Sequence, residues 1–176
     1  MASGTVEFLV LTSGMYVVLL MVTVSLSIMS GSVLQQATQT RLNEISNEIA
    51  ADIINAYSLC YQTSSGQAQT FRPIEIPSSV SMNGYVITLE LENNLWVVHV
   101  CLETTQTIYA ESPLWKISSW TCVETGNGTI TINSYQITYS ATIHSGTSAP
   151  GTKLNPVVWA VRSGGKIRVG IGVIKS

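Results

Sequence analysis

The sequence predicts an α+β protein in which a long N-terminal helix, first hydrophobic and then amphipathic, precedes an antiparallel, immunoglobulin-like β-sandwich. Three observations predict this fold. Residues 8–40 contain no charged residue. An apolar period of three to four residues continues to about residue 58, and a period of two begins beyond residue 66. The expected domains are a membrane or filament-core helix over 1–60 and a sandwich over 61–176.

The first half of the predicted helix is apolar on every side. Residues 8–34 read FLVLTSGMYVVLLMVTVSLSIMSGSVL. A helix of this length spans about 40 Å, more than the hydrocarbon core of a bilayer at about 30 Å. A cleavable signal peptide would have a basic start and a shorter apolar run, whereas the first Lys or Arg here is Arg41. The segment is therefore predicted to span a membrane or to form a filament core.

Small residues form a stripe on this apolar helix, because Thr23, Ser27 and Gly31 are four residues apart. Such stripes let helices approach closely in an apolar medium. The Ser and Thr hydroxyl groups could instead bond to carbonyl groups of their own helix. We favour close packing, because a filament core needs tight contacts between helices.

The second half of the helix carries its apolar residues on one face. No Pro precedes Pro73 and no Gly lies between Gly31 and Gly66, so nothing interrupts the helix in this region. A stripe of this kind must be buried against a partner. We predict that neighbouring copies of the chain bury it, the stripe being Leu42, Ile45, Ile49, Ile53 and Ala56.

The rest of the chain is predicted to form seven to nine short strands joined by turns, with the strand order left open. It is rich in β-branched and aromatic residues that alternate with polar ones. Turns are expected at Asn93-Asn94, Gly126-Asn127-Gly128 and Ser163-Gly164-Gly165. The expected strands are Tyr85–Glu92, Leu95–Glu103, Gln106–Glu111, Trp115–Val123, Thr129–Asn133, Gln136–Ile143, Val157–Arg162 and Lys166–Ile174.

The sequence offers little for catalysis. His99 and Cys101 share one face of a predicted strand, but no third group orients them, so a buried pair in the core is expected. Glu90 and Glu92 are expected to be solvated, and His144 exposed. The chain has no CxxC or HxxxH pattern, and its net charge is −2. We therefore predict no enzyme, no catalytic residue, no metal site, no cofactor and no nucleic-acid partner.

Two features suit an extracellular sandwich. Cys101 and Cys122 fall on predicted strands and could form a disulfide that leaves Cys60 free. The alternative is two buried free thiols. Asn127-Gly128-Thr129 is an acceptor pattern for N-glycosylation, in a turn that is predicted to be exposed.

The start of the chain resembles mature archaeal type IV pilins. In Ser3-Gly4-Thr5-Val6-Glu7-Phe8-Leu9-Val10-Leu11, Glu7 and Leu11 match their pattern directly. Ser3 stands where those proteins have Gln, and Thr5 where they have Ser. Ser30-Gly31-Ser32-Val33-Leu34-Gln35-Gln36 is similar to the region where archaellin helices leave their apolar half. Prepilins carry a short basic leader that is not seen here, so we expect a processed chain or a relative that is never processed.

This resemblance implies a structural subunit of an archaeal type IV pilus-like filament, used for adhesion or, as in archaellins, for motility. It implies a homo-oligomer at the cell surface that is inserted in the membrane before assembly. A prepilin peptidase and an assembly machinery are the implied partners. Glu7 is then expected to meet the terminal amine of a neighbouring subunit, or else to lie at the membrane interface near the positive end of the helix dipole. The alternative function is a single-span, membrane-anchored immunoglobulin-like accessory protein that binds surface-layer or archaellum components.

Overall fold

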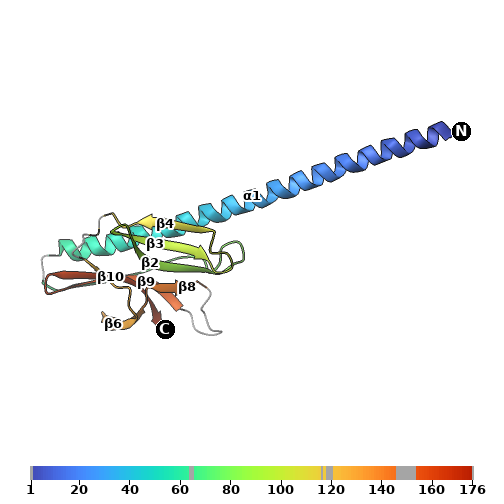
Figure 1. Cartoon of the computed structure of the whole chain (residues 1–176). Helices are drawn as coiled ribbons and strands as arrows, with labels where there is room; N and C mark the ends of the chain where they lie inside the picture. The colour runs from blue at the N-terminus through green and yellow to red at the C-terminus, as the bar shows by residue number, and fades with distance from the viewer. Residues whose placement is uncertain (1, 64–65, 116, 118–120, 146–153, 176) are drawn as a thin grey trace. The chain divides into compact units, whose positions relative to one another are not determined.

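The computed structural model describes the chain except residues 1, 64–65, 116, 118–120, 146–153 and 176, and the side chains of residues 2–7, Leu154 and Lys175. Helix α1 (Ala2–Gln62) precedes the strands (Figure 1). The chain divides into two compact units, Met1–Ala37 and Thr38–Ser176, and we call the second unit the head. The described strands are β1 (Ala68–Pro73), β2 (Tyr85–Glu92), β3 (Leu95–Leu102), β4 (Tyr109–Pro113), β5 (Cys122–Val123), β6 (Gly128–Ile132), β7 (Tyr135–Tyr139), β8 (Thr142–His144), β9 (Leu154–Ser163) and β10 (Lys166–Lys175).

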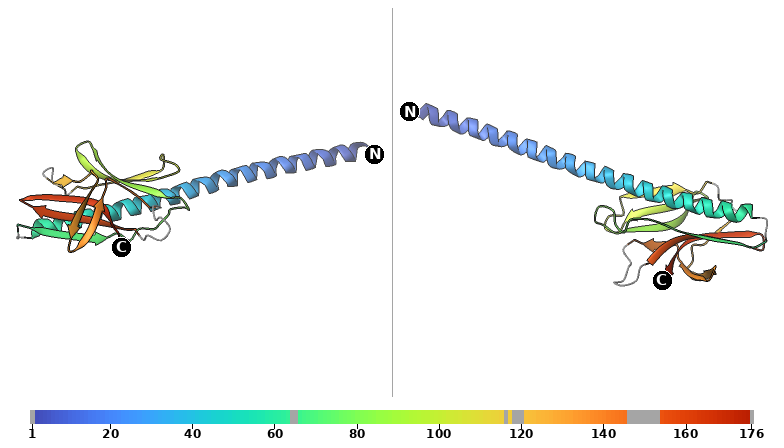
Figure 2. Two further views of the ribbon diagram at one scale, coloured as in Figure 1. Left: turned by 90° about the horizontal axis from the view of Figure 1, so that it is seen from below. Right: turned by 180° about the vertical axis from the view of Figure 1, so that it is seen from behind.

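The strands of the head form two sheets, seen from two further sides in Figure 2. One sheet has the order β4-β3-β2-β8, and the other has the order β1-β9-β10-β7-β6, with β5 paired to β10. Among the described strands only the β5–β10 pair is parallel. The predicted α+β fold, with a long N-terminal helix followed by antiparallel sheets, is confirmed.

Two of the predicted turns set the registers of long hairpins. Asn93 and Asn94 have φ of 48° and 64°, and Gly164 and Gly165 have φ of 59° and 82°. Two consecutive residues with positive φ give a tight turn whose twist matches that of the flanking strands. The turns fix the pairs Glu92↔Leu95 and Ser163↔Lys166, from which β2–β3 and β9–β10 extend.

The main core of the head is enclosed by residues 38–62 of α1 and by both sheets. Ile49 is fully buried there together with Val98 of β3 and Ile171 of β10. Hydrogen bonds fix the helix to each sheet: the Ser46 hydroxyl donates to the carbonyl oxygen of Val98 at 2.9 Å, and the Cys60 thiol lies 3.4 Å from that of Ala160. Residues 38–62 of α1 therefore form one side of the main core.

This burial corrects the prediction that neighbouring copies bury the helix stripe. The head itself covers the stripe, and the exposed fraction is at most 1 % for its Leu and Ile members and 4 % for Ala56. The members are Leu42, Ile45, Ile49, Ile53 and Ala56. Amphipathic periodicity identifies the buried face of a helix, but not whether the same chain or another one covers it.

The domain boundary is corrected for the same reason. The compact units divide between Ala37 and Thr38, inside α1, whereas the sequence placed the boundary after residue 60. Sheets that began at residue 61 would lack the helix that completes their core. We therefore treat residues 38–176 as the smallest unit that buries its apolar surface.

A second core lies on the other side of the six-stranded sheet. Its centre is the fully buried Trp159, whose ring centroid lies 5.2 Å from that of Tyr139. Phe71 of β1, at one end of the strand path β1-β9-β10-β7-β6, contacts Tyr135 of β7, next to the other end, with ring centroids 5.3 Å apart. The sheet thus curls around this second core.

Two arginines fix the C-terminal part of α1 to the six-stranded sheet. Arg162 of β9 donates from Nη1 to the carbonyl oxygen of Thr63 at 2.8 Å and also reaches that of Tyr61. A cation at this position satisfies carbonyl groups at a helix end and interacts favourably with the helix dipole. Arg72 of β1 pairs with Asp52 at 2.9 Å, and the Asp52 side chain is only 9 % exposed.

Replacement of Asp52 by Asn should flatten the pH dependence of head stability. Burial raises the pKa of Asp52 above 3.8 and outweighs the opposing effect of Arg72. The folded head therefore holds this proton more tightly than the unfolded chain does. The resulting stabilisation is complete below the unfolded pKa and is lost as the pH rises through the folded pKa. Asp52→Asn removes that loss.

The measurement is urea unfolding of the head, residues 38–176, at several pH values from about 3 to 7. The wild-type head should lose more stability over the upper part of this range than the Asp52→Asn head. Glu48→Gln, which removes an exposed carboxylate from the same helix, serves as the control. An equal or steeper loss in Asp52→Asn than in wild type would mean that the ion pair with Arg72 dominates.

Candidate functional site: an exposed apolar helix surface

Residues 8–34 of α1, which we call the apolar segment, expose large apolar side chains on all sides. These side chains, from Phe8 to Leu34, are 52–70 % exposed in the chain. The mean hydropathy reaches 2.2 over an 18-residue window, none of which is buried. By length and composition alone, such a helix could cross a membrane. A continuous apolar surface of this size needs a cover of lipid or protein.

Several hydroxyl groups of the apolar segment bond to the backbone of their own helix. Thr12 donates to the carbonyl oxygen of Phe8 at 2.6 Å, and Thr23 donates to that of Leu19 at 2.8 Å. Ser13 and Ser32 bond in the same way to Leu9 and Met29. These bonds satisfy the hydroxyl groups without water, so the side chains suit an apolar medium. For Thr23, the hydrogen bond to Leu19 is the alternative that the sequence left open beside close packing, namely a bond from the hydroxyl group to its own helix.

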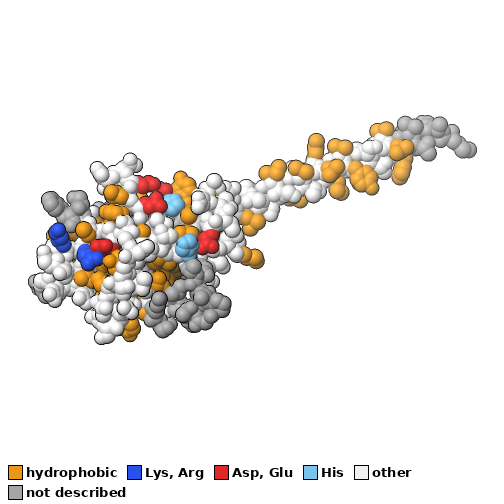
Figure 3. All heavy atoms as spheres, turned by 60° about the horizontal axis from the view of Figure 1, so that its bottom comes forward, with side chains coloured by type: hydrophobic (Ala, Val, Ile, Leu, Met, Phe, Trp, Pro, Cys, Tyr) orange, Lys and Arg blue, Asp and Glu red, His pale blue; other side chains and the backbone are white. Residues whose placement is uncertain are grey.

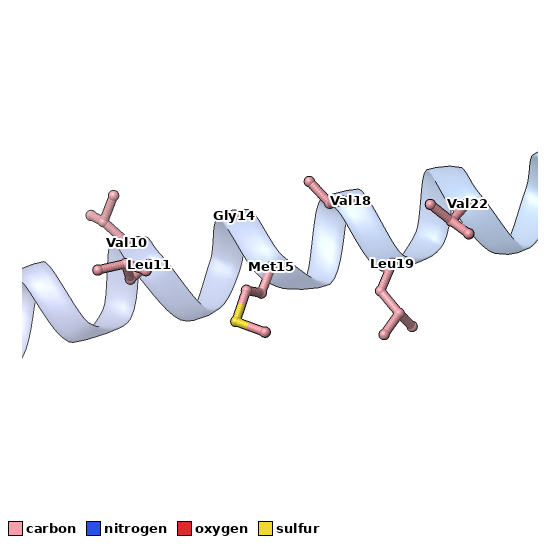
Figure 4. Close-up of a pocket in the computed structure, with 7 residues that line it drawn as sticks. All are labelled: Val10, Leu11, Gly14, Met15, Val18, Leu19 and Val22. Carbon is pink, nitrogen blue, oxygen red and sulfur yellow. The ribbon is translucent and has the colours of Figure 1, made fainter.

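Gly14 forms a notch in the apolar segment. A Cβ atom built at this position would meet nothing within 4 Å. Figure 4 shows Met15 and Leu19 pointing to one side of the helix, with Gly14 and Val18 on the other. A shallow apolar groove surrounds the notch and is lined by Val10, Leu11, Gly14, Met15, Val18, Leu19 and Val22. A groove between bulky side chains can receive the ridge of a second helix.

The other residues predicted for assembly have simple placements. Ser27 and Gly31 are exposed on the apolar segment, as is Thr23. Glu7 lies within α1, but its side chain is outside the described part of the chain. Gly14 was not among the residues predicted for assembly. A Gly inside a long uncharged helix was the signal that could have identified it.

The three cysteines are free thiols in the structure. Cys101 lies on β3 of the four-stranded sheet and Cys122 on β5 of the other sheet, and of the two alternatives left open by the sequence the structure has free thiols and not the disulfide. Cys101 is buried and Cys122 is exposed. Burial raises the pKa of the Cys60 and Cys101 thiols, which keeps them protonated and poorly nucleophilic.

His99 and Cys101 do share a face of β3, but this face points away from the main core. Val98, Val100 and Leu102 belong to that core, whereas His99 and Cys101 alternate with them. Cys101 is buried, as expected, but His99 is only half-buried and neither residue belongs to the main core. His99 stacks on Tyr109 with ring centroids 5.2 Å apart, and its Nε2 lies 4.0 Å from Oε1 of Glu111.

The remaining predicted polar residues lie at the surface of the head. Glu90 and Glu92 are exposed, and His144 is exposed with Nδ1 3.0 Å from Oε1 of Glu103. Asn127 is exposed in the loop before β6, where the sequon could be reached by an enzyme. Among the described residues, no group of three or more His, Cys, Asp or Glu side chains could hold a metal ion.

Comparison with known proteins returns no matching family model, no matching curated protein and no matching solved structure.

Proposed function

We propose that the chain is the structural subunit of a helical surface filament of the archaeal type IV pilus kind, used for adhesion or motility. In this proposal the apolar segments of many copies pack together and form the filament core, while the heads lie outside it. Before assembly the subunit is inserted in the membrane, where a prepilin peptidase and an assembly machinery act on it. The protein is structural and needs no cofactor.

The exposed apolar segment is the observation that carries this proposal. No other part of the described chain covers its large apolar side chains. Four of its hydroxyl groups bond to its own backbone. A surface of this kind fits lipid and fits identical helices equally well. The same subunit can therefore move from a membrane into a bundle without a change of fold. The pattern at Glu7 and Leu11, which resembles archaeal pilins, favours the bundle as its final state.

A membrane-anchored accessory protein is the second candidate, because a mean hydropathy of 2.2 over 18 residues also suits a permanent single span. The two functions differ in where the mature chain is found. We expect the chain to be the main component of filaments sheared from the cell surface. Recovery of the chain only in washed membranes, with no copies in the sheared fraction, would support the accessory protein.

Replacement of Glu7 by Gln should strongly reduce assembly but leave membrane insertion intact. In a packed core of low dielectric, a carboxylate and a neighbour's terminal amine attract far more strongly than in water. The attraction offsets the cost of desolvating both groups only at close range, so it selects one axial register between subunits. Gln keeps the size and hydrogen-bonding capacity of Glu7 but removes its charge.

The measurement compares membrane-bound and filament-bound chain in cells that express wild type or Glu7→Gln. We expect the variant to accumulate in the membrane and to yield roughly tenfold less filament, which corresponds to about 1.4 kcal/mol. Blocking the terminal amine should give the same defect, and both changes together should be no worse than either alone. Normal filament yield from Glu7→Gln would instead place Glu7 at the membrane interface.

A further inference from the structure

The outer face of the four-stranded sheet is acidic. Side chains alternate along its strands, so the residues between those of the main core point outward. The strands β2, β3, β4 and β8 contain no Lys or Arg. We define the acidic face by the glutamates and histidines on or directly after these strands, namely Glu90, Glu92, Glu103, Glu111, His99 and His144.

Aromatic side chains accompany these carboxylates. Tyr109 of β4 is 46 % exposed, and Trp115, just after β4, is 74 % exposed. Aromatic rings attract cations through their electron-rich faces, and exposed Trp and Tyr side chains are frequent anchors of interfaces. Tyr109 lies on the same side of the sheet as His99 and Glu111, so carboxylates and an aromatic ring together form a surface suited to a Lys or Arg side chain.

The end of the β9–β10 hairpin carries the opposite charge. We call Arg162, Lys166 and Arg168 the cationic hairpin. Arg168 pairs with Glu124 at 2.6 Å, whereas Arg162 bonds to backbone carbonyl oxygens and Lys166 is exposed. Within the described part of the chain, neither Arg162 nor Lys166 has a carboxylate partner. Lys166 therefore offers an exposed charge that no described carboxylate of its own head neutralises, whereas the guanidinium group of Arg162 is bound to the end of α1.

We propose that the acidic face of one copy binds the cationic hairpin of a second copy. On the side of the head drawn in Figure 3, several Asp, Glu and His side chains gather in one region, and the Lys and Arg side chains in view lie in another, with one acidic side chain beside them. The two surfaces belong to different sheets, so the contact joins unlike surfaces. A contact between unlike surfaces that does not close on itself builds an open chain of copies. The proposal rests on the filament function. It adds a contact between the heads of two copies to the packing of their helices.

Charge reversal in the full chain tests this contact. Lys166→Glu puts a negative charge on the hairpin, and Glu111→Lys puts a positive charge on the acidic face. Each change alone should slow filament growth roughly tenfold at low salt, and the two together should restore much of the rate. The defects should shrink at about 0.5 M salt, because screening weakens exposed charge pairs. Glu48→Lys, on the exposed side of α1, is the matched control and should grow as wild type.

A second measurement does not depend on filament yield. A carbodiimide joins touching amino and carboxyl groups, and mixing heavy and light isotope-labelled chains identifies links between copies. We expect links from Lys166 to glutamates of the acidic face in another copy, lost in Lys166→Glu. Links of Lys166 only within one copy, or links of the acidic face only to unrelated basic proteins, would overturn the proposal. So would filaments of both reversal variants that grow as fast as wild type, and that outcome leaves the filament function standing.

Discussion

Ile49→Asp should unfold the head. Ile49 is fully buried in the main core between α1 and both sheets, so an aspartate there would be an unpaired buried charge. Such a change costs about 4 kcal/mol or more, against a total stability of about 5–15 kcal/mol for a domain. Filaments should be lost as well, but as a consequence of unfolding. Urea unfolding of residues 38–176, followed by circular dichroism, measures the effect directly.

Two controls separate burial from charge. Asn55→Asp places the same carboxylate on the exposed side of the same helix and should change stability by less than about 0.5 kcal/mol. Ile49→Val removes one methylene group and should cost about 1 kcal/mol. If Ile49→Asp left the head folded and abolished only the filaments, the helix stripe would face neighbouring copies after all.

Leu19→Arg should abolish both membrane insertion and filament assembly while the head stays folded. Leu19 lies near the centre of the apolar segment and is 64 % exposed. An arginine at the centre of a spanning helix costs about 3 kcal/mol on insertion, and in a bundle every copy would bring one charge. Cell fractionation and shearing measure both losses. Resistance of residues 38–176 to protease reports the folded head.

Leu19→Met and Asn43→Arg are the matched controls for this variant. Leu19→Met keeps the apolar character and about the same volume, so insertion and assembly should be normal. Asn43→Arg adds the same charge to an exposed position of α1 within the head, and it should also be tolerated. Wild-type amounts of Leu19→Arg in membranes and filaments would show that the apolar segment has no apolar partner.

Strong local signals made much of the fold predictable. The long helix follows from the absence of Pro and Gly over its second half, and β2 agrees with its predicted bounds. In contrast, β1 carries Gln69, Arg72 and Pro73 and shows no clear alternation, so the sequence did not predict it. The predicted strand Gln136–Ile143 is divided between β7 and β8, which belong to different sheets. Local periodicity does not show where a chain changes sheets.

Within the candidate site, the apolar segment was predictable because it depends only on amino-acid composition. Features that depend on tertiary contacts were not. An uncharged run over 8–40 identifies the apolar segment without any knowledge of tertiary contacts. The partner of the amphipathic stripe was not predictable, because folding and assembly select the same pattern of apolar residues. The surroundings of His99 depend on the pairing of β3 with β4, which brings Tyr109 and Glu111 beside it. That pairing is a property of sheet topology and not of the local sequence.

We propose that the apolar segments of many copies form the core of a filament. Electron microscopy of filaments sheared from the native cell surface, with helical reconstruction, tests it most directly. We predict a core of helices in which residues 8–34 of each copy contact the same residues of neighbouring copies, with the head of residues 38–176 outside. Filaments that contain this chain but leave residues 8–34 out of contact with other copies would contradict the claim.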